Sequence, residues 1–122
     1  MERIREETHG GRTIVYIDFS GFKSNDEFLS LVEAGKPIIS KYAENSIYTI
    51  TDFADVKYDT ATKKIVVDWM MHNKPYVRYA VVIGLDGIKR IMFKNIFALS
   101  GRKNIGVSAS KEAAIQWLLE QE

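Results

Sequence analysis

Three aspartates follow runs of β-prone residues and are the first candidates for chemistry in this chain. Asp18, Asp52 and Asp86 each stand at or just beyond the end of a predicted parallel strand. The carboxyl ends of such strands form the edge where open α/β sheets bind ligands, and carboxylates there can hold Mg²⁺. Aspartate is also favoured at turns, where it accepts hydrogen bonds from backbone amides. No phosphate loop, nucleophile elbow or paired catalytic motif accompanies them, so we expect turn residues, with a magnesium-dependent hydrolase or transferase as the alternative function.

The two histidines give little support for catalysis. His9 lies in a predicted turn and His72 near a predicted helix end, so a multi-histidine metal site is excluded. Lys64, Asp68 and His72 follow one another at i, i+4 spacing and form a polar strip on an otherwise apolar helix. An Asp–His pair can orient a general base, but no nucleophile stands at a defined spacing from it. We therefore expect this strip to face solvent, and we expect no enzyme activity, no cofactor and no metal.

The helix predicted from Asp86 to Ser100 has the most informative pattern. At 100° per residue, the side expected to face the core consists of Ile88, Ile91, Met92, Ile96 and Leu99. Phe93 and Phe97 then fall on the opposite face, which also carries Arg90 and Lys94. We expect this face, with Arg102 just beyond the helix, to form the ligand or partner surface. The phenylalanines would supply apolar contact, Arg90 and Lys94 charge, and Arg102 a contact to an anion.

Several occupants of that surface remain open. Phe93 and Phe97 can dock on a dimer partner, line a groove for an apolar ligand with an anionic head, or press against an anionic membrane. Alternatively, the phase of the helix is different, and this face is buried under the last helix with Trp117 against it.

The charges are distributed unevenly along the chain. The net charge is only +1, which argues against a dedicated nucleic-acid binder. Residues 1–61 contain 7 Lys/Arg and 11 Asp/Glu (net −4), whereas residues 62–122 contain 10 and 5 (net +5). Between Lys74 and Lys103 there are seven basic residues and a single acid, Asp86. This field suits an anionic ligand or an acidic protein face, although a solvated face that maintains solubility is the alternative.

Composition limits the class of protein. The chain has 122 residues, of which 46% are hydrophobic and 27% charged, and no cysteine. We expect a single globular domain over residues 1–122 without disulfides or thiolate zinc sites. No apolar run is long enough to span a bilayer, so stable membrane insertion is not expected. Residues 1–7 are too charged for a signal peptide, which favours a cytoplasmic location.

The elements that position these residues alternate between strand and helix. Gly10 and Gly11 separate two β-prone runs and predict an N-terminal hairpin. The alternation that follows predicts an α/β fold with a mainly parallel central sheet and interleaved helices. Pro37 is expected to kink or split the first helix. Expected strands are Ile4–Thr8, Thr13–Phe19, Ser46–Thr51, Tyr79–Ile83 and Ile105–Val107, and expected helices start near Ser24, at Lys63 (capped by Thr60 or Thr62), at Asp86 and at Lys111 (capped by Ser110).

Several segments in combination resemble the SpoIIAA-like group of small bacterial proteins, which is related to STAS domains and to the CRAL-TRIO lipid-transfer fold. The resemblance is strongest over residues 48–120. It is carried by Asn73-Lys74-Pro75-Tyr76-Val77, Ala80-Val81-Val82-Ile83-Gly84, Gly87-Ile88-Lys89-Arg90, Ser100-Gly101-Arg102 and Glu112-Ala113-Ala114-Ile115-Gln116-Trp117-Leu118.

That resemblance implies a non-enzymatic role in which the domain binds another protein or a small apolar or nucleotide-like ligand. We accordingly expect a regulatory or binding module, forming a homodimer, that acts through protein contacts or through a small apolar or anionic ligand. In STAS anti-sigma-factor antagonists, a serine of an Asp-Ser-Ser-Gly motif at a helix start is phosphorylated. The matching place here reads Tyr58-Asp59-Thr60-Ala61-Thr62. Thr60 is thus the candidate phosphoacceptor, but the Ser-Gly pair is missing, and helix capping is its alternative role.

Overall fold

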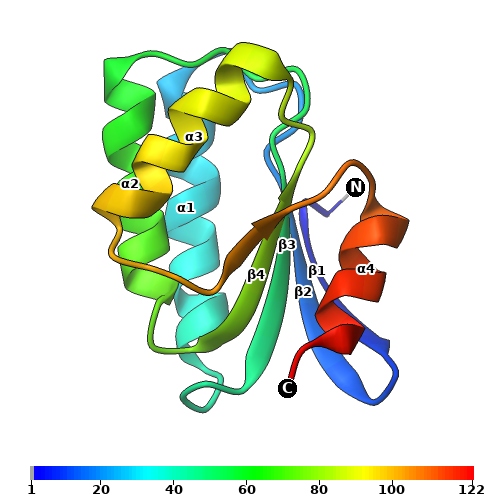
Figure 1. Cartoon of the computed structure of the whole chain (residues 1–122). Helices are drawn as coiled ribbons and strands as arrows, with labels where there is room; N and C mark the ends of the chain where they lie inside the picture. Colours follow the sequence, from blue (N-terminus) through cyan, green and yellow to red (C-terminus); the bar gives the residue numbers. More distant parts are fainter. Residues whose placement is uncertain (1) are drawn as a thin grey trace.

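A single five-stranded sheet organises the computed structural model, which describes residues 2–122 (Figure 1). The first two strands form an antiparallel hairpin, and every later neighbour pair is parallel. This confirms the expected α/β class and the mainly parallel sheet with an N-terminal hairpin. The strands lie in sequence order: β1 (Ile4–His9), β2 (Arg12–Asp18), β3 (Ile47–Asp52), β4 (Val77–Ile83) and β5 (Ile105–Val107).

Three helices cover one face of the sheet and a fourth covers the other (Figure 1). Because β2 to β5 advance in one direction, right-handed crossovers place the connecting helices on the same side. These are α1 (Asn25–Ser40), α2 (Thr60–Asn73) and α3 (Gly87–Leu99), whereas α4 (Lys111–Glu120) follows the last strand and packs on the opposite face. Within residues 2–122, no helix combines the length and apolar character needed to cross a membrane.

The helix starts follow capping chemistry, with one correction. Ser24 caps α1, and Ser110 caps α4 by accepting the Ala113 amide at 3.1 Å, both as expected. The cap of α2 is not Thr60 or Thr62 but Asp59, whose Oδ1 accepts the Thr62 amide at 2.9 Å. A carboxylate is a strong acceptor for the free amides of a first turn, so Asp59 takes the cap and Thr60 becomes the first helical residue.

α1 is not divided at Pro37. It runs without a break from Asn25 to Ser40. One buried residue per turn, Phe28, Val32, Gly35 and Ile39, holds it on the sheet, so the missing proline donor does not end the helix. Gly35 permits close approach to α2, since a Cβ there would lie 2.6 Å from Cη2 of Trp69.

α3 is turned relative to the expected orientation. Phe93 and Ile96 are fully buried, whereas Ile88, Ile91 and Leu99 are 76%, 67% and 59% exposed. The prediction that Phe93 lies on an outer face is therefore wrong. Its ring packs 4.4 Å from that of Phe53 and 5.4 Å from that of Tyr58, a position in which the larger aromatic side chain buries more apolar area than an isoleucine does.

The alternative location under the last helix is wrong as well. Trp117 belongs to the cluster on the α4 face of the sheet, where its ring meets that of Tyr79 at 5.9 Å. Phe93 belongs to the larger cluster between the sheet and α1–α3. Phe97 is half-buried at the margin of that larger cluster.

Candidate anion-binding site

A cavity of about 30 Å³ lies between the sheet and α2. One side is formed by side chains of β3 and β4 that face the helices, and the other by α2 and the segment after α3. Its apolar lining consists of Phe53, Trp69, Met70, Ala80, Val82 and Ile105, and its polar lining of Thr49, Thr51, Asn73 and Arg102. No acidic residue is among these ten, so the polar groups are those that donate hydrogen bonds to a negative charge.

Arg102 is the unusual member of this lining. Its residue exposure is only 8%, and its Nη2 is buried without a hydrogen-bond partner. Its Nε reaches Oδ1 of Asn104 at 3.5 Å, the limit of a hydrogen bond. No carboxylate of residues 2–122 forms a salt bridge with it. Buried arginines are normally paired, so an unpaired guanidinium in a cavity wall has the chemistry of an anion receptor.

The segment after α3 fixes the backbone of Arg102. The backbone amide of Arg102 donates to Ser100 Oγ at 3.3 Å. The side-chain amide of Asn104 donates from Nδ2 to the carbonyl oxygens of Val77 and Arg78 at 3.2 and 2.7 Å. The backbone of this segment is thereby tied to the start of β4. Arg102 is held in place by the fold, and not by an acidic partner.

Burial has an electrostatic consequence for this side chain. It lowers the pKa of Arg102 to about 10, because the charged form loses hydration. The guanidinium is still protonated at neutral pH, so the folded protein keeps an uncompensated positive charge inside. An anion in the cavity offsets this cost.

Three neutral residues that can donate hydrogen bonds line the same cavity as Arg102. Thr49 and Thr51 are both buried and, two residues apart on β3, face the same side of the sheet. Asn73, at the end of α2, has its Oδ1 2.9 Å from Nδ1 of His72. An amide oxygen only accepts, so His72 is the donor in this contact and the Asn73 amide nitrogen is left to donate elsewhere.

Cavity size limits the ligand. A volume of about 30 Å³ is roughly twice what one water needs. It admits a halide, nitrate or a carboxylate group, and it does not admit a nucleotide. The arrangement can bind a small anion beside apolar walls.

The other expected surface residues do not gather at this cavity. Arg90 and Lys94 are exposed on α3, Phe97 is half-buried, and Phe93 is inside the main core. Arg102 was expected beside them on the outer surface, but it lies in the cavity wall. The expected surface is therefore split into an outer basic pair and an interior arginine.

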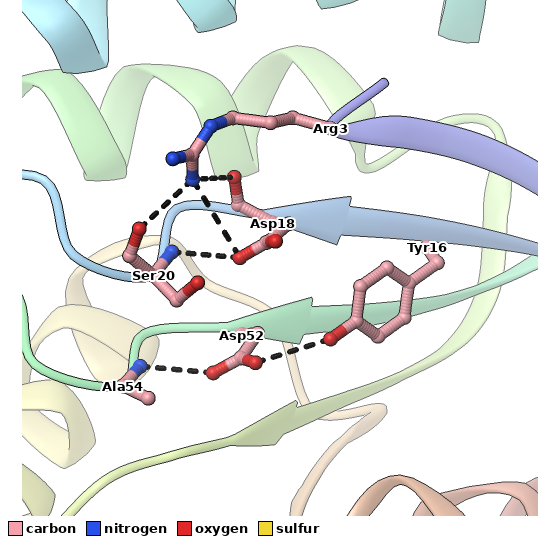
Figure 2. A network of polar contacts seen from close by, with 6 residues as sticks. All are labelled: Arg3, Tyr16, Asp18, Ser20, Asp52 and Ala54. Carbon is pink, nitrogen blue, oxygen red and sulfur yellow. Dashed lines mark hydrogen bonds and ion pairs between the residues drawn. The ribbon is translucent and has the colours of Figure 1, made fainter. Parts of the chain in front are cut away.

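At the carboxyl ends of β2 and β3, the carboxylates of Asp18 and Asp52 accept structural hydrogen bonds (Figure 2). Asp18 Oδ1 accepts the Ser20 amide at 2.8 Å and lies 3.8 Å from Nη1 of Arg3. Asp52 accepts the Ala54 amide at 2.9 Å and the Tyr16 hydroxyl at 3.1 Å. Asp86 precedes α3 without a side-chain cap bond. Within residues 2–122, no three potential ligands come together as a metal site.

The polar strip on α2 does not form an Asp–His pair. Asp68 receives Lys36 of α1 at 2.9 Å, and the His72 ring lies parallel to that of Trp69 with centroids 6.1 Å apart. Lys64 and Asp68 are exposed, as expected of a solvent-facing strip. His72 contributes instead by holding Asn73.

Sequence reasoning missed most of the cavity. Thr49, Thr51 and Asn73 were not singled out, although the two threonines alternate with apolar residues in a strand buried on both faces. Two hydroxyls on one side of such a strand are a usable signal, because buried polar groups need partners.

Comparisons with known proteins do not assign the chain. No protein-family model matches it, and no curated protein matches it in sequence.

Proposed function

We propose that this protein is a non-enzymatic binding module that takes up a small monovalent anion or the carboxylate group of a small ligand at Arg102. The observation that carries the proposal is the buried, unpartnered Nη2 of Arg102 in the wall of a cavity whose other polar residues are Thr49, Thr51 and Asn73. Fixed donors in a low-dielectric site bind charge more strongly than the same donors in water.

A regulatory role as a STAS-type or SpoIIAA-like domain, with a protein partner, is part of the same proposal. It is supported by the hairpin, the sequential parallel strands and the helices that cover one face. The proposal includes no phosphorylation of Thr60, because the Ser-Gly pair of the phosphorylated motif is missing here.

Anion titration followed by the fluorescence of Trp69 tests the proposal. The chain has two tryptophans, so a Trp117→Phe background leaves Trp69, which lines the cavity, as the single reporter. Sodium formate, acetate, nitrate and chloride are titrated at constant ionic strength, with phosphate as a larger anion. Saturable changes are expected for the small anions and a weaker response for phosphate.

The matched variants are Arg102→Gln and Lys103→Gln. Both remove one positive charge from neighbouring positions, but Lys103 is exposed and Arg102 is buried. Loss of saturation in Arg102→Gln alone supports the site. Equal responses in both variants, or no saturable response in the parent, contradict it.

A further inference from the structure

Apolar side chains are exposed mainly on the helices that cover one face of the sheet. All the exposed large hydrophobic residues among residues 2–122 lie on α1, α2 and α3. They are Leu29 (43%), Met71 (56%), Ile88 (76%), Ile91 (67%) and Leu99 (59%). We call the outer surface of these three helices the helix layer. Large apolar groups gathered on one exposed face indicate a contact surface.

Charge on the helix layer changes sign from one side to the other. α2 contacts both α1 and α3 and therefore lies between them. The exposed side of α1 carries Asp26 and Glu33, whereas that of α3 carries Arg90 and Lys94. Neither Arg90 nor Lys94 forms a salt bridge with any of residues 2–122. The sequential strand order explains this gradient, because it places the acidic half of the chain at one side and the basic half at the other.

This charge pattern favours one binding partner for the helix layer over the others. An anionic bilayer attracts α3 but repels the acidic side of α1, which belongs to the same face. A second copy stacked with α1 on α1 also places like charges together. A twofold axis parallel to the helices does the opposite, because it sets α1 of each copy against α3 of its partner, and two acidic–basic contacts form at once.

We propose that two copies of this chain associate face to face through the helix layer, with α1 of each copy against α3 of the other. Met71 on the central helix then lies near the twofold axis, and Ile91 and Leu99 are covered by the partner. This surface is separate from the Arg102 cavity, so the proposal does not rest on anion binding.

The helix layer is large enough for such a contact. Helices of 13 to 16 residues are about 20 Å long, and three neighbours span about 30 Å. That gives a flat area of about 600 Å². Projecting side chains increase the accessible surface, which brings it towards the roughly 800 Å² per partner typical of stable interfaces. Closed twofold dimers are also the commonest soluble assemblies.

Sedimentation equilibrium of the full-length chain at several concentrations and two salt concentrations tests the dimer. A dissociation constant that rises with salt is expected, because exposed charge pairs are screened. Ile91→Glu should raise it at least ten-fold, since a charge replaces a covered apolar group. Gln116→Glu on α4 is the control, because Gln116 is exposed on the opposite face.

Charge exchange distinguishes this arrangement from other dimers. Lys94→Glu alone and Glu33→Lys alone should each weaken association roughly ten-fold, and the double variant should restore it to within about three-fold at unchanged net charge. Far-ultraviolet circular dichroism confirms that each variant is folded.

Three results overturn the proposal. These are a monomer at all concentrations, a dimer that Gln116→Glu weakens as much as Ile91→Glu does, and a double variant no better than the single ones. If the monomer binds vesicles that contain anionic lipid, and Ile91→Glu abolishes that binding, the helix layer is a membrane-binding surface instead.

Discussion

Asp18 and Asp52 are register partners on the neighbouring strands β2 and β3, and each carboxylate accepts the backbone amide two residues further along its own chain segment. The two distances are 2.8 Å to Ser20 and 2.9 Å to Ala54. The same local turn therefore ends both strands. Aspartate at this edge of the sheet fixes the direction in which the chain leaves it, which is the structural role expected from turn chemistry.

The Asp52 carboxylate also controls a neighbouring tyrosine. Burial, followed by the charge of Asp52 and its hydrogen bond, raises the pKa of Tyr16 to about 12. Asp52→Asn should lower the pKa of Tyr16 but leave it above the ordinary value of 10, because burial remains. Ultraviolet absorbance of tyrosinate, recorded as the difference between each protein and its Tyr16→Phe version, measures this. An unchanged Tyr16 titration would show that Asp52 does not act on it.

The raised pKa of Tyr16 also determines the direction in which this residue changes the free energy of unfolding at alkaline pH. A tyrosine whose pKa is raised on folding contributes stability that is complete below the unfolded pKa and is lost as the pH rises through the folded value. The free energy of unfolding should therefore fall between about pH 10 and pH 12, and the fall should be smaller in Asp52→Asn than in the parent. Urea unfolding at successive pH values gives the comparison.

Arg102 is predicted to lower the stability of the fold. Because burial lowers its pKa to about 10, the charged form costs folding energy at neutral pH, on the order of 3 kcal/mol. Arg102→Met should therefore raise the free energy of unfolding by about 1–3 kcal/mol while anion binding disappears.

Anion-free urea unfolding of the parent, Arg102→Met and Lys103→Met measures the difference. Lys103 is exposed, so its replacement should change stability by less than about 0.5 kcal/mol. A less stable Arg102→Met would mean that the guanidinium makes net favourable contacts inside the protein.

Hydrophobic periodicity predicted the fold well where an element has one apolar face. The hairpin, the order of helices and strands, and the caps Ser24 and Ser110 follow from local chemistry and were confirmed. α3 was oriented wrongly because it is apolar on two sides. Its phase is decided by the site offered to Phe93 between Phe53 and Tyr58, which no local pattern contains.

The candidate site was less predictable for a similar reason. Arg102 was selected as an anion contact from its charge and position, but its burial depends on the segment that Asn104 ties to β4. Thr49 and Asn73 reach the same cavity from elements far apart in sequence. Only tertiary packing brings them together, so spacing along the chain could not reveal the set.

Gly84 is predicted to be the least replaceable glycine at the end of the strands. Its φ is +81°, and a Cβ would lie 2.5 Å from the Ala54 nitrogen and 2.6 Å from Asp52 Oδ1. Gly84→Ala should cost more than about 2 kcal/mol, because backbone strain and a clash with backbone add. Gly87, the first residue of α3, has open space around it, so Gly87→Ala should be neutral or stabilising by up to about 1 kcal/mol. Urea unfolding of both variants checks the contrast, and similar losses for the two would contradict it.

The orientation of α3 gives the last prediction. Phe93 is fully buried against Phe53 and Tyr58, whereas Ile91 is 67% exposed two residues earlier on the same helix. Phe93→Ala should therefore lower the free energy of unfolding by about 3–5 kcal/mol, through lost burial and the cavity left behind. Ile91→Ala should change it by less than about 0.5 kcal/mol when measured dilute enough for the chain to be monomeric. Unfolding at that dilution separates stability from association, since Ile91 lies in the proposed dimer surface. If Ile91→Ala proves the more damaging of the two, the helix faces the core with its isoleucines and the orientation described here is wrong.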